Sequence, residues 1–250
     1  MQSKNVEVPF GTPACPDRRA FLRLTGGAAI AGVVGANLSG RLAYADALSK
    51  EQRDGMTPDE ILAGFKRGNA HFSEGLRKSR NHLKEQQATA KGQHPSAVVL
   101  SCIDSRAPAE VIMDLGIGDI FNARVAGNIS NDDILGSMEF ACKLSGAKVV
   151  LVMGHTACGA IKGAIDNAEL GNLTGLLAKI KPAVKATTYQ GDLSSKNGAY
   201  VDAVARTNVT LTIADIRKNS PVLAELESKG TIKIVGAMYD LETAALNFLA

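Results

Sequence analysis

The sequence AVVLSCIDSR, residues 97–106, joins a short apolar run to a polar loop that carries a cysteine and two opposite charges. The run at 97–100 has no polar alternation, which is typical of a strand buried on both faces. Three further short runs are also predicted to be strands, at residues 120–125, 148–153 and 232–238. Strands of this kind belong to parallel sheets that helices cover on both sides.

Helical patterns fill the intervals between these runs. Thr57, Pro58, Asp59 and Glu60 predict a helix start, because they supply a cap, a proline in the first turn and acidic groups favourable to the helix dipole. Further helices are expected at 76–90, 133–144, 160–167, 173–185 and 199–218, with a loop at 187–198. The alternation predicts one α/β domain with a mostly parallel central sheet flanked by helices.

A second polar motif, HTACG at residues 155–159, follows the apolar run at 148–153. Both motifs therefore follow strands of a parallel sheet, at the edge where open α/β sheets bind ligands. Two thiolates and one imidazole suit Zn²⁺, and three protein ligands leave one position open, as in catalytic zinc sites. The sequence thus predicts one zinc ion per chain at the C-terminal ends of the strands, held by Cys102, His155 and Cys158.

One acidic and one basic residue, Asp104 and Arg106, follow the first cysteine. Zinc lowers the pKa of its bound water, but two thiolates weaken this effect and a nearby cation offsets part of the loss. Separately, a cysteine after a strand is commonly a small buried apolar residue, and two cysteines of an exported protein can form a disulfide. Neither alternative explains both motifs and the charge pair together. For Cys142, within the helix expected at 133–144, structural burial is the better interpretation.

With C-x-D-S-R at residues 102–106 and H-x-x-C-G at 155–159, the chain resembles the β-class carbonic anhydrases from residue 57 to residue 240. The resemblance implies reversible, zinc-dependent hydration of carbon dioxide to bicarbonate and a proton. It also implies that Asp104 is paired with Arg106, and that this aspartate either orients the attacking oxygen or swings in as a fourth metal ligand.

Four other positions match the family singly. Gln93 matches a glutamine that hydrogen-bonds the substrate across a dimer interface, which implies a homodimer or a larger homo-oligomer. Phe121 and Phe140 match positions of an apolar substrate pocket, and the backbone amide of Gly159 matches a donor that faces a substrate oxygen. The stretch RVAGN at 124–128 departs from the more usual R-N-A-G-N. Because the chain has no tryptophan, the usual Trp-dependent inhibitory site is excluded, and the open, water-bound zinc form is favoured.

Two alternative functions remain open at this point. Carbon disulfide or carbonyl sulfide hydrolases share the fold and the metal chemistry, so the motifs do not separate them from a carbonic anhydrase. A non-catalytic protein that is stabilised by zinc belongs to a different class. The Asp104–Arg106 pair and the open fourth position argue against that second alternative.

Residues 1–45 are interpreted as a signal peptide of the twin-arginine type. The motif DRRAFL at 17–22 precedes a Gly- and Ala-rich apolar stretch at 24–38, and AYA at 43–45 supplies a cleavage site. A buried glycine-rich helix or a membrane anchor is the alternative, but the stretch is short and weakly hydrophobic for a spanning helix. We therefore expect the twin-arginine export machinery as a partner, a periplasmic location, and a carbonic-anhydrase-like domain at 46–250.

The charge of the chain is balanced once this segment is set aside. Of 28 basic and 25 acidic residues, the first 45 positions hold five and two, which leaves 23 of each sign in the rest. A domain near neutrality offers no net attraction to a polyanion, so no nucleic-acid partner is expected.

Overall fold

A computed structural model describes residues 47–249, so the predicted signal peptide at 1–45 lies outside the described residues. Five strands form one sheet in the order β2-β1-β3-β4-β5. The first four are parallel and β5 is antiparallel to β4, which confirms the mostly parallel sheet. The strands are β1 (Ala97–Ser101), β2 (Ile120–Arg124), β3 (Val149–His155), β4 (Lys233–Tyr239) and β5 (Leu246–Phe248).

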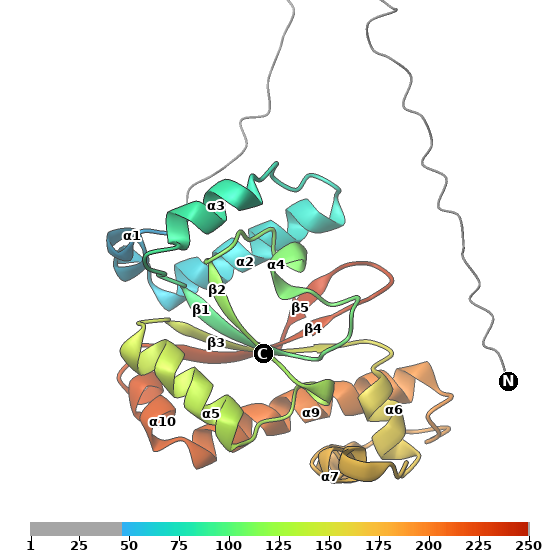
Figure 1. The fold of residues 1–250 in the computed structure, drawn as a ribbon. Coiled ribbons are helices and arrows are strands. Elements are labelled where there is room, and N and C mark those ends of the chain that lie inside the picture. Colours follow the sequence, from blue (N-terminus) through green and yellow to red (C-terminus); the bar gives the residue numbers. More distant parts are fainter. Residues whose placement is uncertain (1–46, 250) are drawn as a thin grey trace, which may run out of the picture. The chain divides into compact units, whose positions relative to one another are not determined.

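Helices cover both faces of this sheet, with α1 to α4 on one side and α5, α6, α9 and α10 on the other (Figure 1). The α-helices are α1 (Lys50–Gly55), α2 (Pro58–Ser73), α3 (His82–Thr89), α4 (Ala109–Ile112), α5 (Asp132–Glu139), α6 (Gly159–Ile165), α7 (Gly171–Ala178), α8 (Lys181–Ala186), α9 (Gly198–Asn219) and α10 (Pro221–Ser228). A 3₁₀ turn, η2 (Ala126–Asn128), follows β2, and a π-helical turn, η3 (Phe140–Leu144), continues α5.

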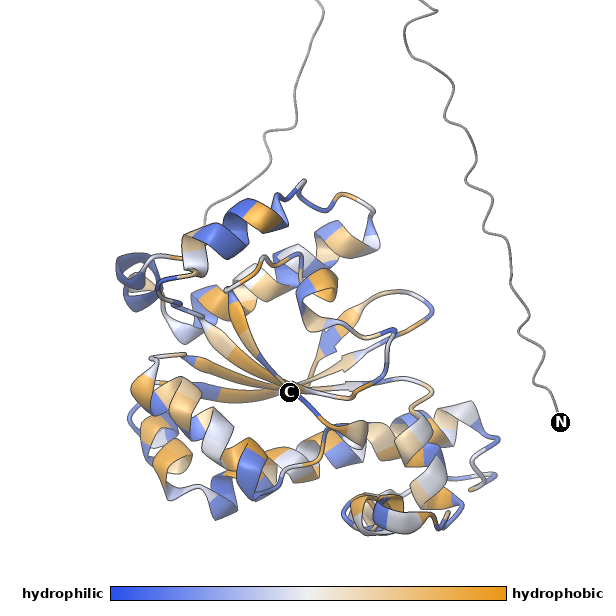
Figure 2. Ribbon diagram, in the orientation of Figure 1, coloured by the Kyte–Doolittle hydropathy of each residue, from blue (hydrophilic) through white to orange (hydrophobic). Residues whose placement is uncertain are grey.

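The alternation of side chains along β1 divides the core into two layers. Val98 and Leu100 pack with residues of α5, α9 and α10, whereas Val99 packs with Ile61 and Phe65 of α2. Every residue of β1 and β3 is buried, as the unbroken apolar runs predict. Figure 2 shows the strands as a hydrophobic centre between helices whose colours are mixed.

Two helix predictions need correction. The segment predicted at 76–90 is helical only from His82, because the Asn81 side chain caps Lys84 N–H and begins the helix there. The single helix predicted at 173–185 is two helices, α7 and α8, and Pro182 lies in the first turn of α8, where a missing N–H is tolerated. The helix predicted at 133–144 is present, and its last turn is the π turn η3.

None of the helices within residues 47–249 combines the length and the apolar character that crossing a bilayer requires.

Gly68 is the point of closest approach between α2 and the end of α4. A Cβ atom at this position would overlap the carbonyl oxygen of Met113, a backbone atom that cannot move aside cheaply. We expect Gly68→Ala to lower the free energy of unfolding by about 2 kcal/mol or more, as overpacking of a core does. Gly64→Ala, one helical turn earlier, is the control: its Cβ would meet only Arg67 at 3.9 Å, so it stays neutral or gains stability. Equal denaturation midpoints for the two variants would contradict this packing.

Candidate active site

The two motifs meet because their strands are neighbours in the sheet. Cys102 follows β1, His155 is the last residue of β3, and Cys158 immediately precedes α6. β1 and β3 are parallel, so their carboxyl ends lie at one edge of the sheet. The ligand atoms of Cys102, His155 and Cys158 all lie within 4.8 Å of one another, and all three residues are buried. This cluster lies where the sequence predicts a metal site.

The histidine of the cluster has the tautomer that a metal ligand needs. His155 Nδ1 lies 2.8 Å from the carbonyl oxygen of Thr156 and donates to it, which leaves Nε2 as the nitrogen with a lone pair. Among the described residues, this buried Nε2 has no hydrogen-bond partner. A bound cation would supply the missing partner.

The sulfur atoms of Cys102 and Cys158 lie close together. Both thiols are free, so the disulfide alternative does not describe this structure. A hydrogen bond from Cys158 lowers the pKa of Cys102, and the same contact with Cys102 raises the pKa of Cys158. Two thiolates this close repel each other unless a cation lies between them. The donor set of two sulfurs and one imidazole therefore fits Zn²⁺.

Arg106 holds the carboxylate of Asp104 beside the cluster. Asp104 Oδ1 accepts the Arg106 backbone N–H at 2.9 Å and its Nε–H at 3.0 Å, while Oδ2 accepts Nη2–H at 2.8 Å. The Arg106 hydrogen bonds keep the pKa of Asp104 far below its usual range. Asp104 Oδ2 lies 3.8 Å from His155 Nε2. The carboxylate is thus ionised and paired with the arginine, and its role as a fourth metal ligand stays a prediction.

Arg124 has a structural role that sequence analysis did not find. Its Nε donates to the Cys102 carbonyl at 2.8 Å and its Nη2 to the Asp104 carbonyl at 2.5 Å, so it holds the backbone of the metal-binding loop. Arg124 ends β2 and pairs with Ser101 of β1. The parallel pairing of β1 and β2 places Arg124 beside Ser101, the residue before Cys102, and this register is the feature that could have indicated the role.

The predicted substrate-binding residues do not all meet in one chain. Phe121 and Phe140 pack edge to face with ring centroids 6.2 Å apart, and they line a hollow of about 550 Å³ beside β2. Gly159 begins α6 next to Cys158, and the space above its Cα is open. Gln93 is exposed and precedes β1, so it lies at the end of this strand opposite to Cys102. The structure therefore brings Gly159 to the metal cluster and leaves Gln93 away from it.

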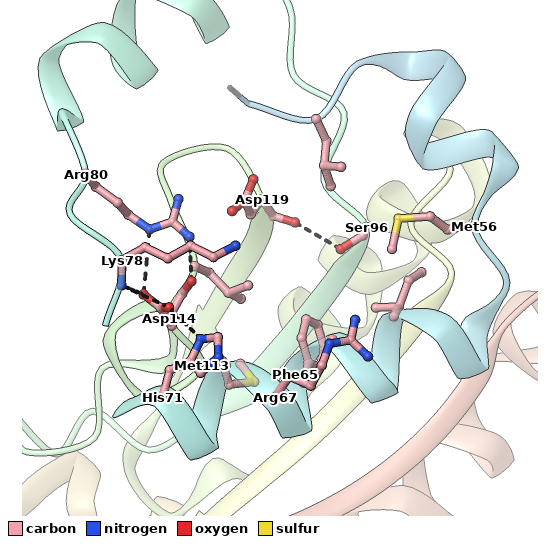
Figure 3. Close-up of a pocket in the computed structure, with 15 residues that line it drawn as sticks. Met56, Phe65, Arg67, His71, Lys78, Arg80, Ser96, Met113, Asp114 and Asp119 are labelled. Atoms are coloured by element: carbon pink, nitrogen blue, oxygen red, sulfur yellow. Dashed lines mark hydrogen bonds and ion pairs between the residues drawn. The ribbon is translucent and has the colours of Figure 1, made fainter. Parts of the chain in front are cut away.

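A separate polar cavity of about 280 Å³ lies at the amino end of β1, next to Ser96 (Figure 3). The buried Asp114 on its wall faces His71 Nδ1 at 3.3 Å and accepts the backbone N–H of Lys78 at 3.2 Å. Arg80 lies between this aspartate and the buried Glu85. No metal ligand of the cluster lines this cavity, and its buried Asp114 faces His71 and Arg80. We assign it a structural role in joining α2, α3 and α4.

Comparisons with known proteins agree with this site. A family model described as carbonic anhydrase matches residues 97–246. Carbonic anhydrase 2 of Mycobacterium tuberculosis is 32% identical over 187 residues, which cover 74% of this chain and 89% of that protein. The carbonic anhydrase of Mycolicibacterium smegmatis is 33% identical over 192 residues with the same coverage.

Solved structures show the same fold. The β-carbonic anhydrase CafA of Aspergillus fumigatus matches with a TM-score of 0.59 and 26% identity, over 76% of this chain and 89% of that chain. A match to tetrameric β-carbonic anhydrases of Sordaria macrospora has a TM-score of 0.56 and 24% identity, over 77% of this chain and 93% of that chain. On the motifs, the geometry of the cluster and these relatives, the chain belongs to the β-class carbonic anhydrase family.

Proposed function

We infer that this protein is a zinc enzyme that reversibly hydrates carbon dioxide to bicarbonate and a proton. The observation that carries the inference is the buried convergence of Cys102, His155 and Cys158 next to an ionised Asp104 held by Arg106. The two mycobacterial relatives are named carbonic anhydrases and align over 89% of their length, which supports the same activity.

The chain's own residues prepare the site for this reaction. Zinc, when bound by Cys102, His155 and Cys158, acidifies a water molecule and so supplies a nucleophile near neutral pH. Arg106 uses three donors to fix Asp104 as an ionised group that only accepts hydrogen bonds. Such a group accepts the O–H of the nucleophile and turns a lone pair of its oxygen toward the carbon of the substrate.

The Gly159 amide is proposed to donate to a substrate oxygen. The glycine is exposed, and a Cβ atom there would meet nothing within 4 Å, so a three-atom substrate has room beside Cys158. This donor would face the oxygen on which negative charge grows as bicarbonate forms.

We propose that the working enzyme is a homodimer or a larger homo-oligomer. Gln93 and Cys102 lie at opposite ends of β1, so a glutamine that contacts the substrate must come from a second copy. Phe140 is 50% exposed at the edge of the sheet formed by β2, which leaves an apolar side chain for a second copy to cover. The Sordaria macrospora structures, described as tetrameric, are consistent with this assembly.

Residues 1–45 are proposed to direct export to the periplasm by the twin-arginine route. This route carries folded proteins, so zinc would be bound where thiols stay reduced. Replacing both Arg18 and Arg19 with lysine is expected to leave folded, zinc-loaded enzyme in the cytoplasm, because the paired arginines are the recognised feature of the signal. Cell fractionation followed by immunoblotting measures the change. Lys4→Arg is the control and is expected to be exported normally. Export of the double variant to the same extent as this control would overturn the assignment.

Stopped-flow measurement with a pH indicator tests the activity. Mixing the zinc-loaded enzyme with dissolved carbon dioxide is expected to give rapid acidification that depends on the enzyme concentration. Carbonyl sulfide and carbon disulfide serve as competing substrates in the same buffer. Faster turnover of either sulfur compound than of carbon dioxide would assign the protein to the sulfur-compound hydrolases instead.

A further inference from the structure

We infer that helix α9 positions the metal ligands through two side chains, Asp202 and Asn208, which hold the loops around the cluster from one rigid element. α9 packs against β3, which ends in His155, against α6, which follows Cys158, and against η2, whose Gly127 faces Cys102 (Figure 1). The inference concerns positioning and depends on the proposed function only for its activity readout.

Asp202 holds the turn between two of the ligands. Ala157 lies between His155 and Cys158 with a φ of 54°, a left-handed conformation that an alanine adopts at a cost. Its backbone N–H donates to Asp202 Oδ1 at 2.9 Å. A hydrogen bond to an ionised acceptor is among the stronger kinds, and here it favours the strained conformation that points both ligands at one place.

Asn208 holds the turn that supports the third ligand. This residue is 3% exposed, and its Nδ2 donates to the Gly127 carbonyl at 2.8 Å. The Gly127 N–H in turn donates to Cys102 Sγ at 3.3 Å. Gly127 has a φ of 69°, and a Cβ there would lie 2.5 Å from Ile180 Cδ1, so this position needs glycine. Asn208 therefore holds Gly127, the residue whose N–H faces the Cys102 sulfur, through the carbonyl on its other side.

The helix can act as a fixed reference because it is locked onto the sheet. A Cβ atom at Gly154 of β3 or at Gly236 of β4 would come within 2.7 Å of Val209, which shows how closely α9 approaches both strands. Side chains on so closely packed a helix cannot drift relative to the strand ends. Loss of either tether is therefore expected to loosen the metal site while the fold persists.

Asp202→Ala is the decisive variant, and Asp202→Asn and Asp215→Ala are its controls. The asparagine keeps an oxygen acceptor at the same place. Asp215→Ala removes a carboxylate from the same helix, but the hydrogen bonds of Asp215 reach Ser130 and Asn219 instead of the metal loops. The readout is the rate at which zinc passes from the holoenzyme to a chelator, measured alongside thermal unfolding.

We expect Asp202→Ala to release zinc about tenfold faster, the size of effect that loss of a partner behind a metal ligand produces. Asp202→Asn should release zinc at a rate between those of the wild type and Asp202→Ala, because the amide oxygen still accepts the Ala157 N–H but carries no charge. Adding Ala157→Gly to Asp202→Ala should recover part of the loss, because glycine adopts the left-handed conformation without strain. Zinc release in Asp202→Ala no faster than in Asp215→Ala would overturn the role of Asp202.

The cobalt-substituted protein tests Asn208 separately. Asn208→Ser should shift the thiolate-to-cobalt absorption band, because the amide that donates to Cys102 is no longer held, whereas Asn219→Ser on the same helix should leave it in place. An unshifted band in Asn208→Ser would remove Asn208 from the inference. Zinc release and the cobalt absorption band both report on the metal and not on turnover. If every variant and the wild type failed to hydrate carbon dioxide, the proposed function would be contradicted, and these two measurements would still test the inference.

Discussion

Cys158→Ser is expected to lose most of its zinc and to fall to background rates of carbon dioxide hydration. The serine hydroxyl is not ionised at neutral pH, so it replaces an anionic soft ligand with a poor neutral one. Cys158 is buried and supplies one of the three ligand atoms that lie within 4.8 Å of one another, so its replacement leaves two of them. Metal analysis after gel filtration and stopped flow on the same sample measure both losses.

Cys142→Ser is the matched control for this variant. Cys142 is also buried and free, but it lies in the π turn η3, and burial raises the pKa of its thiol to about 12. Its replacement is expected to cost some stability and to leave the zinc content unchanged. Retention of metal with full turnover in Cys158→Ser would show that Cys158 is not a ligand.

Asp104→Asn is expected to separate metal binding from catalysis. The amide is nearly isosteric, but it carries no charge for Arg106 and presents an NH₂ donor where the ionised carboxylate only accepts. The two side-chain hydrogen bonds from Arg106 that now fix both oxygens would be weakened or lost at one of them. We expect hydration at least about tenfold slower, the loss typical of removing a group that orients a metal-site reactant, with zinc content near that of the wild type.

The control for the amide substitution is Asp192→Asn. Asp192 is exposed, accepts a hydrogen bond from Ser194, and is far from both motifs in the sequence. Unchanged hydration in Asp104→Asn would remove Asp104 from the mechanism. Loss of zinc from this variant would instead identify Asp104 as a ligand of the resting enzyme and contradict the open form.

The metal ligands could be predicted from sequence because each follows from local pattern. The apolar runs before Cys102 and His155 identify buried parallel strands, and such strands end at a common edge. Hydrogen bonds between distant segments leave no such pattern. Asp202 lies 45 residues from Ala157, and Asn208 lies 81 residues from Gly127, so only the folded chain reveals them as partners.

The helix errors have a comparable origin. Helical periodicity extends through Pro182 and through residues 76–81, but a proline in a first turn and the Asn81 cap decide where helices start. The position of Gln93 is a different case. Its match to the family concerns an interface between copies, and a single chain places it at the wrong end of β1 for contact with Cys102.

The central claim is tested most directly by measuring zinc content and carbon dioxide turnover on the same sample. A chelator first removes the metal, and added zinc then restores it. We predict about one zinc per chain at full activity, as a single three-ligand site requires. Turnover is then expected to fall in proportion to the zinc removed and to return when zinc is restored. Turnover that persists in metal-free protein, or its absence from protein that holds one zinc per chain, would contradict the assignment of Cys102, His155 and Cys158 as the catalytic metal site.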